Sequence, residues 1–285
     1  MSVSTAEEGD LTTDSRRRFD GGDADVDAIL LPTVDTGLPL TQDTEWCELA
    51  VNGRRERVRF HDYGRIFDIP GLYERIFYDI LACNSPRRVV RLLDEVLEDF
   101  EDTDGLRVID VGAGNGIDGE ELSALEPEHV VGLDILEEAQ QAARRDRPEV
   151  YDEYVVTDLT DLSPDTAARL EAADFNCLVS VATLGFNDIP PEAFAAAAGF
   201  VDTPGWLAFN VKEDFLQEGE GSGFGRFIER LQRAGVIQVQ AYRRYRHRLS
   251  VSGKPLHYVA VVARKLREIP ESFVDERGDA QPATA

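Results

Sequence analysis

The sequence contains few cysteines and no long apolar stretch. Its three cysteines, Cys47, Cys83 and Cys177, lie far apart and show neither metal-ligand spacing nor the pattern of a disulfide framework. No run of about 18 or more apolar residues occurs, which predicts that no helix spans a membrane. Residues 1–10 are polar and acidic and lack the apolar core of a secretion signal. We therefore expect a cytoplasmic protein without a bound metal or a membrane contact.

Lysine is also scarce. Only Lys212, Lys254 and Lys265 are lysines among 30 basic residues, which stand against 55 acidic ones and leave a formal net charge of -25. Such a surface repels itself in dilute buffer and is better tolerated where salt screens its charges. The composition is similar to that of proteins from salt-accumulating, halophilic organisms. It disfavours non-specific binding to nucleic acid.

Residue patterns divide the chain into four regions. Ser, Thr, Asp, Glu and Gly dominate residues 1–27, which predicts a disordered acidic N-terminus. Residues 28–104 are expected to form a hairpin and a helical lid region, and residues 105–268 an α/β domain. The composition of residues 269–285 again predicts a flexible tail.

The hairpin is indicated by Asn52-Gly53 between strand-like runs over 44–51 and 54–60. Helical periodicity then follows over 71–83 and 86–100. Aromatic residues on the first of these helices, and the segment that precedes it, are where we expect a lid.

From Leu106 onward, short β-branched runs alternate with helical ones. Strands are expected over 107–111, 130–134, 154–157, 175–180, 205–211, 236–242 and 256–263. Helices are expected over 119–124, 137–144, 165–172, 193–200 and 225–234. The short connection at 250–255 makes the last two strands an antiparallel hairpin. The predicted fold class is α/β, with a Rossmann-like, seven-stranded, mostly parallel sheet, helices on both faces and this antiparallel C-terminal hairpin.

A glycine-rich turn follows the first of these strands. Gly112, Gly114 and Gly116 let the backbone turn sharply and let a ligand lie against it. The dinucleotide pattern G-x-G-x-x-G requires glycine at 117, where this chain has Ile117. Asp110, two positions before the first glycine, repels a pyrophosphate and suits a ligand with an ammonium group, such as the methionine end of S-adenosylmethionine.

Two later strands also end in an acid. Asp134, followed by Ile135, is placed to accept hydrogen bonds from ribose hydroxyls. Asp158 is placed to accept from an adenine amino group, and the backbone N–H of Leu159 to donate to the adenine ring. Each acid alone is equally consistent with a solvated strand end in so acidic a chain, and NAD enzymes use an acid at the position of Asp134. Three in succession favour a ligand at the carboxyl edge of the sheet.

Residues 107–185 resemble the cofactor-binding half of class I S-adenosylmethionine-dependent methyltransferases. The segment 108–116 resembles the first motif of that family, Asp134 and Asp158 its second and third acidic positions, and 174–180 its fourth strand. The resemblance implies S-adenosylmethionine as the cofactor and a methyltransferase domain over 105–268. Its implied cofactor-binding residues are Asp110, Gly112, Ala113, Gly114, Asn115, Gly116, Asp134, Ile135, Asp158, Leu159 and Ser180. The segments 116–122 and 150–158 are similar, more narrowly, to the Williams–Beuren-region methyltransferase-like group.

The sequence is less informative about the methyl acceptor. The run 180–186 has no Asp/Asn-Pro-Pro-Tyr clamp, and no Pro-Cys nucleophile is present, which argues against DNA methylation. Because the sulfonium donor is already activated, a dedicated catalytic residue is optional, and we assign none. Tyr63 and Asn210 are candidates for the acceptor side. The most consistent hypothesis is a small-molecule acceptor.

Three alternatives remain open at this point, and the oligomeric state is not indicated. A protein or RNA methyltransferase could use the basic run 242–248 for docking, although arginines in a strand also commonly pair with local acids. A regulatory protein could bind S-adenosylmethionine without transferring a methyl group. An NAD-dependent dehydrogenase is the least consistent with the glycine spacing.

Overall fold

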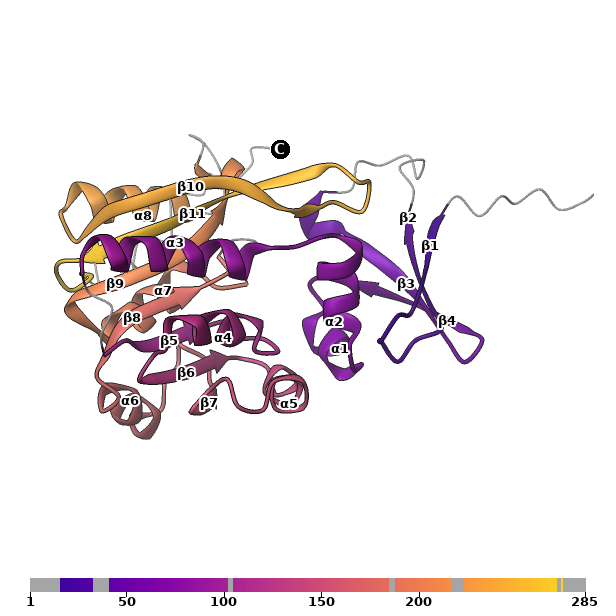
Figure 1. Cartoon of the computed structure of the whole chain (residues 1–285), viewed down its shortest axis with the longest axis horizontal. Helices are drawn as coiled ribbons and strands as arrows, with labels where there is room; N and C mark the ends of the chain where they lie inside the picture. The colour runs from indigo at the N-terminus through magenta and orange to yellow at the C-terminus, as the bar shows by residue number, and fades with distance from the viewer. Residues whose placement is uncertain are drawn as a thin grey trace, which may run out of the picture.

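The computed structural model describes residues 16–32, 41–101, 105–184, 188–216, 223–270 and 273. Two sheets organise the chain, as Figure 1 shows: a four-stranded sheet near the N-terminus and a seven-stranded sheet that carries the rest. The strands of the larger sheet are β5 (Arg107–Val111), β6 (His129–Asp134), β7 (Glu153–Val156), β8 (Phe175–Ser180), β9 (Val201–Lys212), β10 (Ile237–Leu249) and β11 (Pro255–Lys265).

The larger sheet has the order β10-β11-β9-β8-β5-β6-β7. Strands β9, β8, β5, β6 and β7 pair in parallel. Strand β11 pairs antiparallel with both β9 and β10, so it alone runs against the other six. This confirms the predicted fold class, including the antiparallel C-terminal hairpin.

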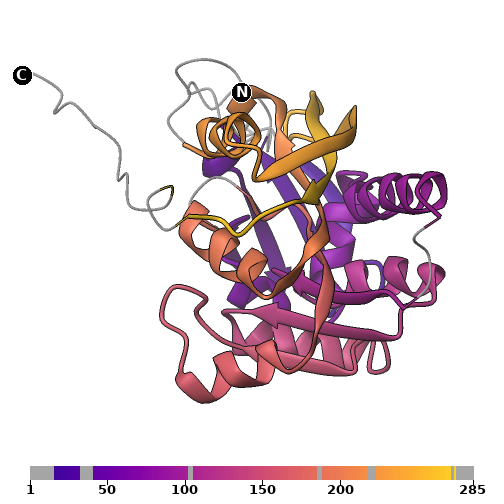
Figure 2. The same cartoon turned by 90° about the vertical axis from the view of Figure 1, so that its left-hand side faces the viewer.

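Helices cover both faces of this sheet, as the turned view in Figure 2 shows. Helices α3 (Ser85–Asp99) and α4 (Ile117–Leu122) pack on one face, in a core that includes Val108 and Cys177. Helices α6 (Pro164–Glu171), α7 (Pro191–Gly199) and α8 (Phe224–Arg233) pack on the other, around Ile109 and Leu178. Helix α5 (Glu137–Asp146) lies beside β6 and β7. The alternation of Val108 and Ile109 between two cores is that of a strand buried on both faces.

The N-terminal sheet is antiparallel, in the order β1-β2-β3-β4. Its strands are β1 (Arg16–Asp20), β2 (Ala28–Pro32), β3 (Trp46–Val51) and β4 (Arg54–Arg59). The predicted hairpin is confirmed: β3 and β4 join through Asn52 and Gly53, both with positive φ.

The expectation of disorder throughout residues 1–27 is wrong for residues 16–27. Strand β1 pairs with β2 over five residue pairs, and Phe19 packs against the core of the small sheet. The order comes from tertiary pairing, which composition does not reveal. Residues 1–15 lie outside the described part. Of the expected flexible tail, Ile269 and Phe273 pack against the main core, and most of the remainder lies outside the described residues.

A helical segment joins the two sheets. Helix α1 (Tyr63–Asp68), which the sequence did not predict, is followed by α2 (Leu72–Glu74) and by one stretch of π-helix (Arg75–Ile80) where a single helix was expected. Short 3₁₀ turns lie at 42–44, 123–125 and 213–216. Among the described helices, none is long and apolar enough to cross a membrane.

Strands β5 and β8 mark the point where the chain reverses its direction of travel across the sheet. After β5 it proceeds outward through β6 and β7, and then crosses to β8 on the other side of β5. In open α/β sheets, ligands bind outside the carboxyl ends of the strands at such a point. We therefore expect a ligand to bind at the loops that follow Val111 and Ser180.

Candidate functional site

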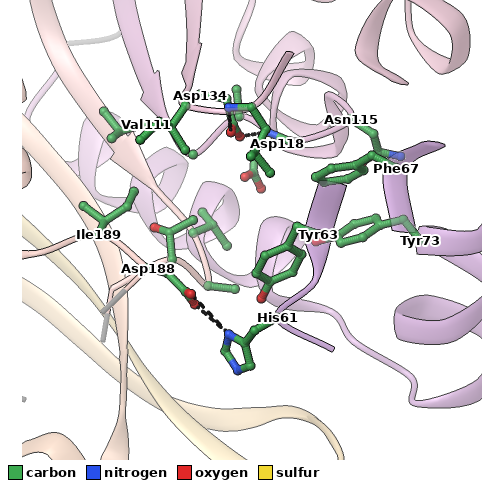
Figure 3. A pocket seen from close by; sticks show the side chains of 18 of the residues that line it. His61, Tyr63, Phe67, Tyr73, Val111, Asn115, Asp118, Asp134, Asp188 and Ile189 are labelled. Carbon is green, nitrogen blue, oxygen red and sulfur yellow. Dashed lines mark hydrogen bonds and ion pairs between the residues drawn. The ribbon is translucent and has the colours of Figure 1, made fainter. Parts of the chain in front are cut away.

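A cavity of about 670 Å³ opens at this point of the sheet. One half is formed by the glycine-rich turn and the ends of β6 and β7, at residues 111–118, 133–136 and 157–160. The other half is formed by aromatic residues of the N-terminal region together with Asp188, His247 and Tyr258. Figure 3 shows side chains from both halves around one space. A volume of this size holds a small organic ligand.

The glycine-rich turn is fixed by backbone hydrogen bonds. The N–H groups of Gly112 and Ala113 both donate to the carbonyl of Leu133, at 2.8 and 2.9 Å. Gly112 has φ +80°, and a Cβ there would come within 2.4 Å of the methyl carbon of Thr183. A Cβ on Gly114 would meet the ring of Phe67 at 3.3 Å. The glycines are thus required by backbone conformation and by close neighbours.

Asp134 lies where the sequence predicted, at the end of β6 and in the cavity wall. Its Oδ2 accepts a 3.0 Å hydrogen bond from the N–H of Gly114, and its Oδ1 accepts one of 3.0 Å from the N–H of Leu136. Burial raises the pKa of Asp134, while these two bonds oppose the rise. Each carboxylate oxygen retains a second lone pair for an added donor such as a ribose hydroxyl.

Asp110 is placed differently from the prediction. It is fully buried and lies behind the turn, outside the cavity lining. Its Oδ2 accepts a 2.6 Å hydrogen bond from the hydroxyl of Tyr151, and burial raises its pKa to about 7. The prediction was a contact between Asp110 and the ligand ammonium, made directly or through water; in this structure Asp110 lies outside the cavity lining, and its contact with the ammonium stays a prediction.

Asp118 also lines the cavity, and the sequence pattern did not single it out. It is the second residue of α4, is 6% exposed and lines the cavity, where Figure 3 shows it directed into the central space. Its Oδ1 has no hydrogen-bond partner in the described structure. Burial raises its pKa strongly, and repulsion by Asp110 adds to the rise. A desolvated carboxyl group without a partner is suited to a cationic ligand group.

Asp158, Ile135 and Leu159 line the half of the cavity that is formed by the glycine-rich turn and the ends of β6 and β7. Asp158 is exposed, and its Oδ1 accepts hydrogen bonds from the side chain and backbone N–H of Thr160, which lower its pKa. Ile135 is 61% exposed, a high value for a large apolar side chain. This half of the cavity therefore offers both an apolar surface and a fixed carboxylate to a flat ligand ring.

Asn115 connects the turn to the N-terminal region. Its side-chain N–H donates to Glu74 of α2 at 3.1 Å and to Asp146 of α5 at 3.4 Å. Arg147 also donates to Glu74, at 2.7 Å. These bonds hold α2 against the turn, so the N-terminal helices form one wall of the cavity.

Ser180 and Asn210 lie outside the cavity lining, contrary to their predicted roles. The Ser180 hydroxyl is fully buried and donates to the carbonyl of Val111 at 3.0 Å. The Asn210 amide is also fully buried; its oxygen accepts from the N–H of Ala182 and its nitrogen donates to the hydroxyl of Tyr245. Both side chains hold neighbouring loops in place, because their polar groups are engaged within the core.

Tyr63 does line the cavity, as predicted. Its ring stacks at 6.2 Å from that of Phe67 and lies edge-on to His61 at 5.7 Å. Burial raises the pKa of its hydroxyl, so the group stays protonated. Nδ1 of His61 lies 3.1 Å from Asp188, in a pair that joins the N-terminal region to the loop after β8.

The basic run 242–248 lies within β10, which extends beyond the predicted strand end. Arg243 pairs with Glu95 at 2.7 Å, Arg244 with Glu213 at 2.6 Å, and the buried Arg248 with Glu45 at 2.6 Å. These arginines are thus engaged by acids of this chain. Across the described ranges, no group of three or more His, Cys, Asp or Glu is placed to hold a metal ion.

Residues 109–209 match the family model for a methyltransferase domain. The match covers the turn, Asp118, Asp134 and Asp158, and it supports the predicted class I methyltransferase and S-adenosylmethionine as its cofactor. The narrower likeness to the Williams–Beuren-region group stays a prediction.

Several solved structures resemble this chain at low identity. They include a putative RNA methyltransferase from Pyrococcus horikoshii, 14% identical over 63% of this chain and 85% of that one, with a TM-score of 0.45. A magnesium protoporphyrin IX methyltransferase from Synechocystis with bound S-adenosylmethionine is 16% identical over 63% and 79%, with a TM-score of 0.41. No curated protein sequence matches this chain. At these scores, no substrate transfers from a neighbour to this chain.

Proposed function

We propose that this protein transfers a methyl group from S-adenosylmethionine to a small molecule held in the aromatic half of the cavity. The observation that carries the proposal is the convergence of three features on one cavity: the glycine turn, Asp134, and Asp118, whose Oδ1 has no hydrogen-bond partner in the described structure. Asp118 would hold the ammonium group of the methionine end, Asp134 the ribose hydroxyls, and Asp158 with Leu159 the adenine edge.

The protein's contribution to such a reaction is positional. The sulfonium supplies an activated methyl group, so the residues around it need to align the acceptor and exclude water. The glycine-rich turn, which backbone hydrogen bonds hold in place, and the aromatic side chains of the N-terminal helices can align the acceptor and exclude water. The cavity volume of about 670 Å³ suits a small acceptor, and the ion pairs of Arg243 and Arg244 weaken the case for a macromolecule docked on β10.

Calorimetry in molar salt tests the proposal. We expect S-adenosylmethionine and S-adenosylhomocysteine to bind and NAD not to bind; a preference for NAD would reject it. Asp134→Ala should weaken binding of both by about tenfold or more, because buried hydroxyls lose their acceptor. Methyl transfer to metabolite fractions separates an enzyme from a regulatory protein, which would bind the cofactor without consuming it.

The Arg243→Ala, Arg246→Ala double variant tests the macromolecular alternative. For a small-molecule enzyme we expect unchanged turnover, since both side chains are exposed and neither lines the cavity. A selective loss of methyl transfer to RNA or protein, with cofactor affinity retained, would favour that alternative.

A further inference from the structure

We infer that the aromatic half of the cavity, here called the acceptor chamber, takes an amine attached to a flat apolar group. This inference rests on the proposed function and names its substrate class. The chamber is lined by Gln42, Phe60, His61, Tyr63, Phe67, Tyr73, Phe77, Asp188, Arg248 and Tyr258. Anionic acceptors such as carboxylates and phosphates are excluded from it by charge.

The charge of the cavity is the first argument. Its described lining contains six acidic side chains: Asp62, Asp118, Asp134, Glu138, Asp158 and Asp188. Arg248 is the one Arg or Lys side chain in that lining, and it is 4% exposed. Its guanidinium donates to Glu45 at 2.6 Å and to the carbonyl of Leu249 at 2.9 Å, so its charge is already neutralised. An anion entering the acceptor chamber would meet Asp188 and would find no unpaired Arg or Lys side chain in the described lining.

His247 adds no positive charge. It is buried, its Nδ1 lies 2.6 Å from the hydroxyl of Ser85, and its ring stacks on Tyr258. Burial and the nearby Arg248 lower its pKa well below the usual histidine value. The imidazole therefore stays neutral.

Two of the remaining polar side chains, Gln42 and Asp188, present hydrogen-bond acceptors. The side-chain nitrogen of Gln42 donates to the hydroxyl of Tyr258 at 2.7 Å, while its oxygen is buried without a partner in the described structure. The Asp188 carboxylate lies beside His61 in the same lining, and Figure 3 shows the end of the Tyr63 ring directed toward that pair. A ligand that satisfies both Gln42 and Asp188 must donate hydrogen bonds, as an ammonium or amine does.

The walls suit the remainder of such a ligand. The rings of Tyr63, Phe67, Tyr73 and Phe77 lie 4.9–6.5 Å from one another and form a continuous aromatic surface. Aromatic faces attract a cation and pack against a flat apolar group. In an amine attached to an aromatic ring system, the ammonium group is the cation and the ring is the flat apolar group.

The reaction balances with these groups. The bound ammonium gives up one proton, the freed nitrogen lone pair forms a bond to the methyl carbon, and the carbon–sulfur bond breaks with its electrons staying on sulfur. The products are a methylated ammonium, a thioether and one proton. That proton leaves by way of Asp188 and His61, whose side chains are 26% and 17% exposed and so reach solvent.

Ligand pairs of opposite charge test the inference. The full-length protein, saturated with S-adenosylhomocysteine in molar salt, is titrated with benzylamine, phenethylamine and tryptamine. Each is compared with its carboxylate counterpart, namely benzoate, phenylacetate and indole-3-acetate, and with the matching alcohol. We expect at least one amine to bind tenfold or more tightly than its carboxylate and its alcohol. Equal affinity, a preference for carboxylate or alcohol, or no binding at millimolar concentration would overturn the inference.

Two variants locate the effect. Asp188→Asn should reduce the amine preference about tenfold, and Gln42→Met about threefold or more, without changing affinity for S-adenosylhomocysteine. Asp152→Asn is the matched control, because Asp152 also pairs with a histidine, His129 at 3.3 Å, but lies outside the cavity lining. Unchanged preference in both chamber variants would overturn the inference, whereas failure of the wild type to bind S-adenosylhomocysteine would overturn the proposed function itself.

Discussion

The hydroxyl of Tyr151 donates a 2.6 Å hydrogen bond to Oδ2 of Asp110, whose other carboxylate oxygen is buried without a partner in the described structure. Burial raises the pKa of Asp110 from 3.8 to about 7, although the Tyr151 bond lowers it. The carboxyl group therefore keeps its proton in the folded protein at pH values where an unfolded chain has released it.

Asp110 should make stability fall as pH rises. Between about pH 4 and 7 the folded state binds more protons than the unfolded state, so the free energy of unfolding decreases with pH by up to about 1.4 kcal/mol per unit. Asp110→Asn removes this contribution. Urea unfolding of both proteins from pH 4.5 to 7.5 should show the variant gaining stability relative to the wild type as pH rises; parallel curves would contradict the assignment.

Asp118 should decide affinity for the amino-acid end of the cofactor. Asp118→Asn should weaken S-adenosylhomocysteine binding roughly 10- to 100-fold, the range of a lost charged hydrogen bond. Methylthioadenosine, which has no ammonium group, should bind the variant and the wild type equally. Calorimetry measures both ligands, and the surface variant Asp165→Asn serves as the control. An equal loss for both ligands would mean that Asp118 supports the turn and does not contact the ammonium.

The packing of Gly112 against Thr183 gives a prediction about stability. Gly112→Ala combines an unfavourable φ of +80° with a Cβ placed 2.4 Å from a methyl carbon, so we expect a clear fall in the free energy of unfolding. Adding Thr183→Ser removes that methyl group and keeps the hydroxyl that lies 2.7 Å from Ser180. The double variant should recover the steric part and retain about 1–2 kcal/mol of backbone strain. If the double variant recovers no stability, backbone strain at position 112 accounts for the whole loss.

The sequence allowed correct prediction of features encoded locally. The parallel strands appear as apolar runs, and the turn as closely spaced glycines, so the residue pattern was enough to place Asp134 at the end of β6. The orientation of Asp110 could not be predicted in this way, because it depends on the pleat of β5 and on Tyr151, a partner 41 residues away.

The acceptor chamber could not be predicted from local sequence patterns either, because residues far apart in the sequence form it. Gln42 and Tyr258, which share a wall, are separated by 216 residues in sequence. Tyr63 could be proposed as part of a lid and for the acceptor side, but the sequence does not show that residues of β10 and β11 line the same cavity. Asn210 was a candidate for binding the acceptor because strand ends are commonly exposed. In the structure it is completely buried, and its side chain bonds to Ala182 and Tyr245.

The acidic composition predicts a stability that depends on salt. With a formal net charge of -25, self-repulsion opposes the compact state, and salt shortens the range of that repulsion from about 10 Å at 0.1 M to about 3 Å at 1 M. The melting temperature should therefore rise between 0.1 and 1 M KCl. Sucrose at matched water activity is the control for general stabilisation, and a melting temperature that does not change with KCl would contradict a halophilic interpretation.

The buried pair of Arg248 and Glu45 yields the sharpest test of the chamber's construction. Their side chains are 5% and 1% exposed, and Glu45 also accepts a 2.7 Å hydrogen bond from the N–H of Val251. Glu45→Gln leaves a buried guanidinium without a counter-charge, which should cost about 3–5 kcal/mol of unfolding free energy.

A matched surface pair provides the comparison. Glu56→Gln breaks the pair with Arg65, whose side chains are 47% and 35% exposed, and should cost less than about 1 kcal/mol. Chemical denaturation of both variants in the same salt measures the difference. Because Glu45→Gln frees the positive charge of Arg248 inside the chamber, any folded fraction should also bind phenylacetate more tightly than the wild type does. Similar stability losses in the two variants would mean that water reaches Arg248 and screens its charge.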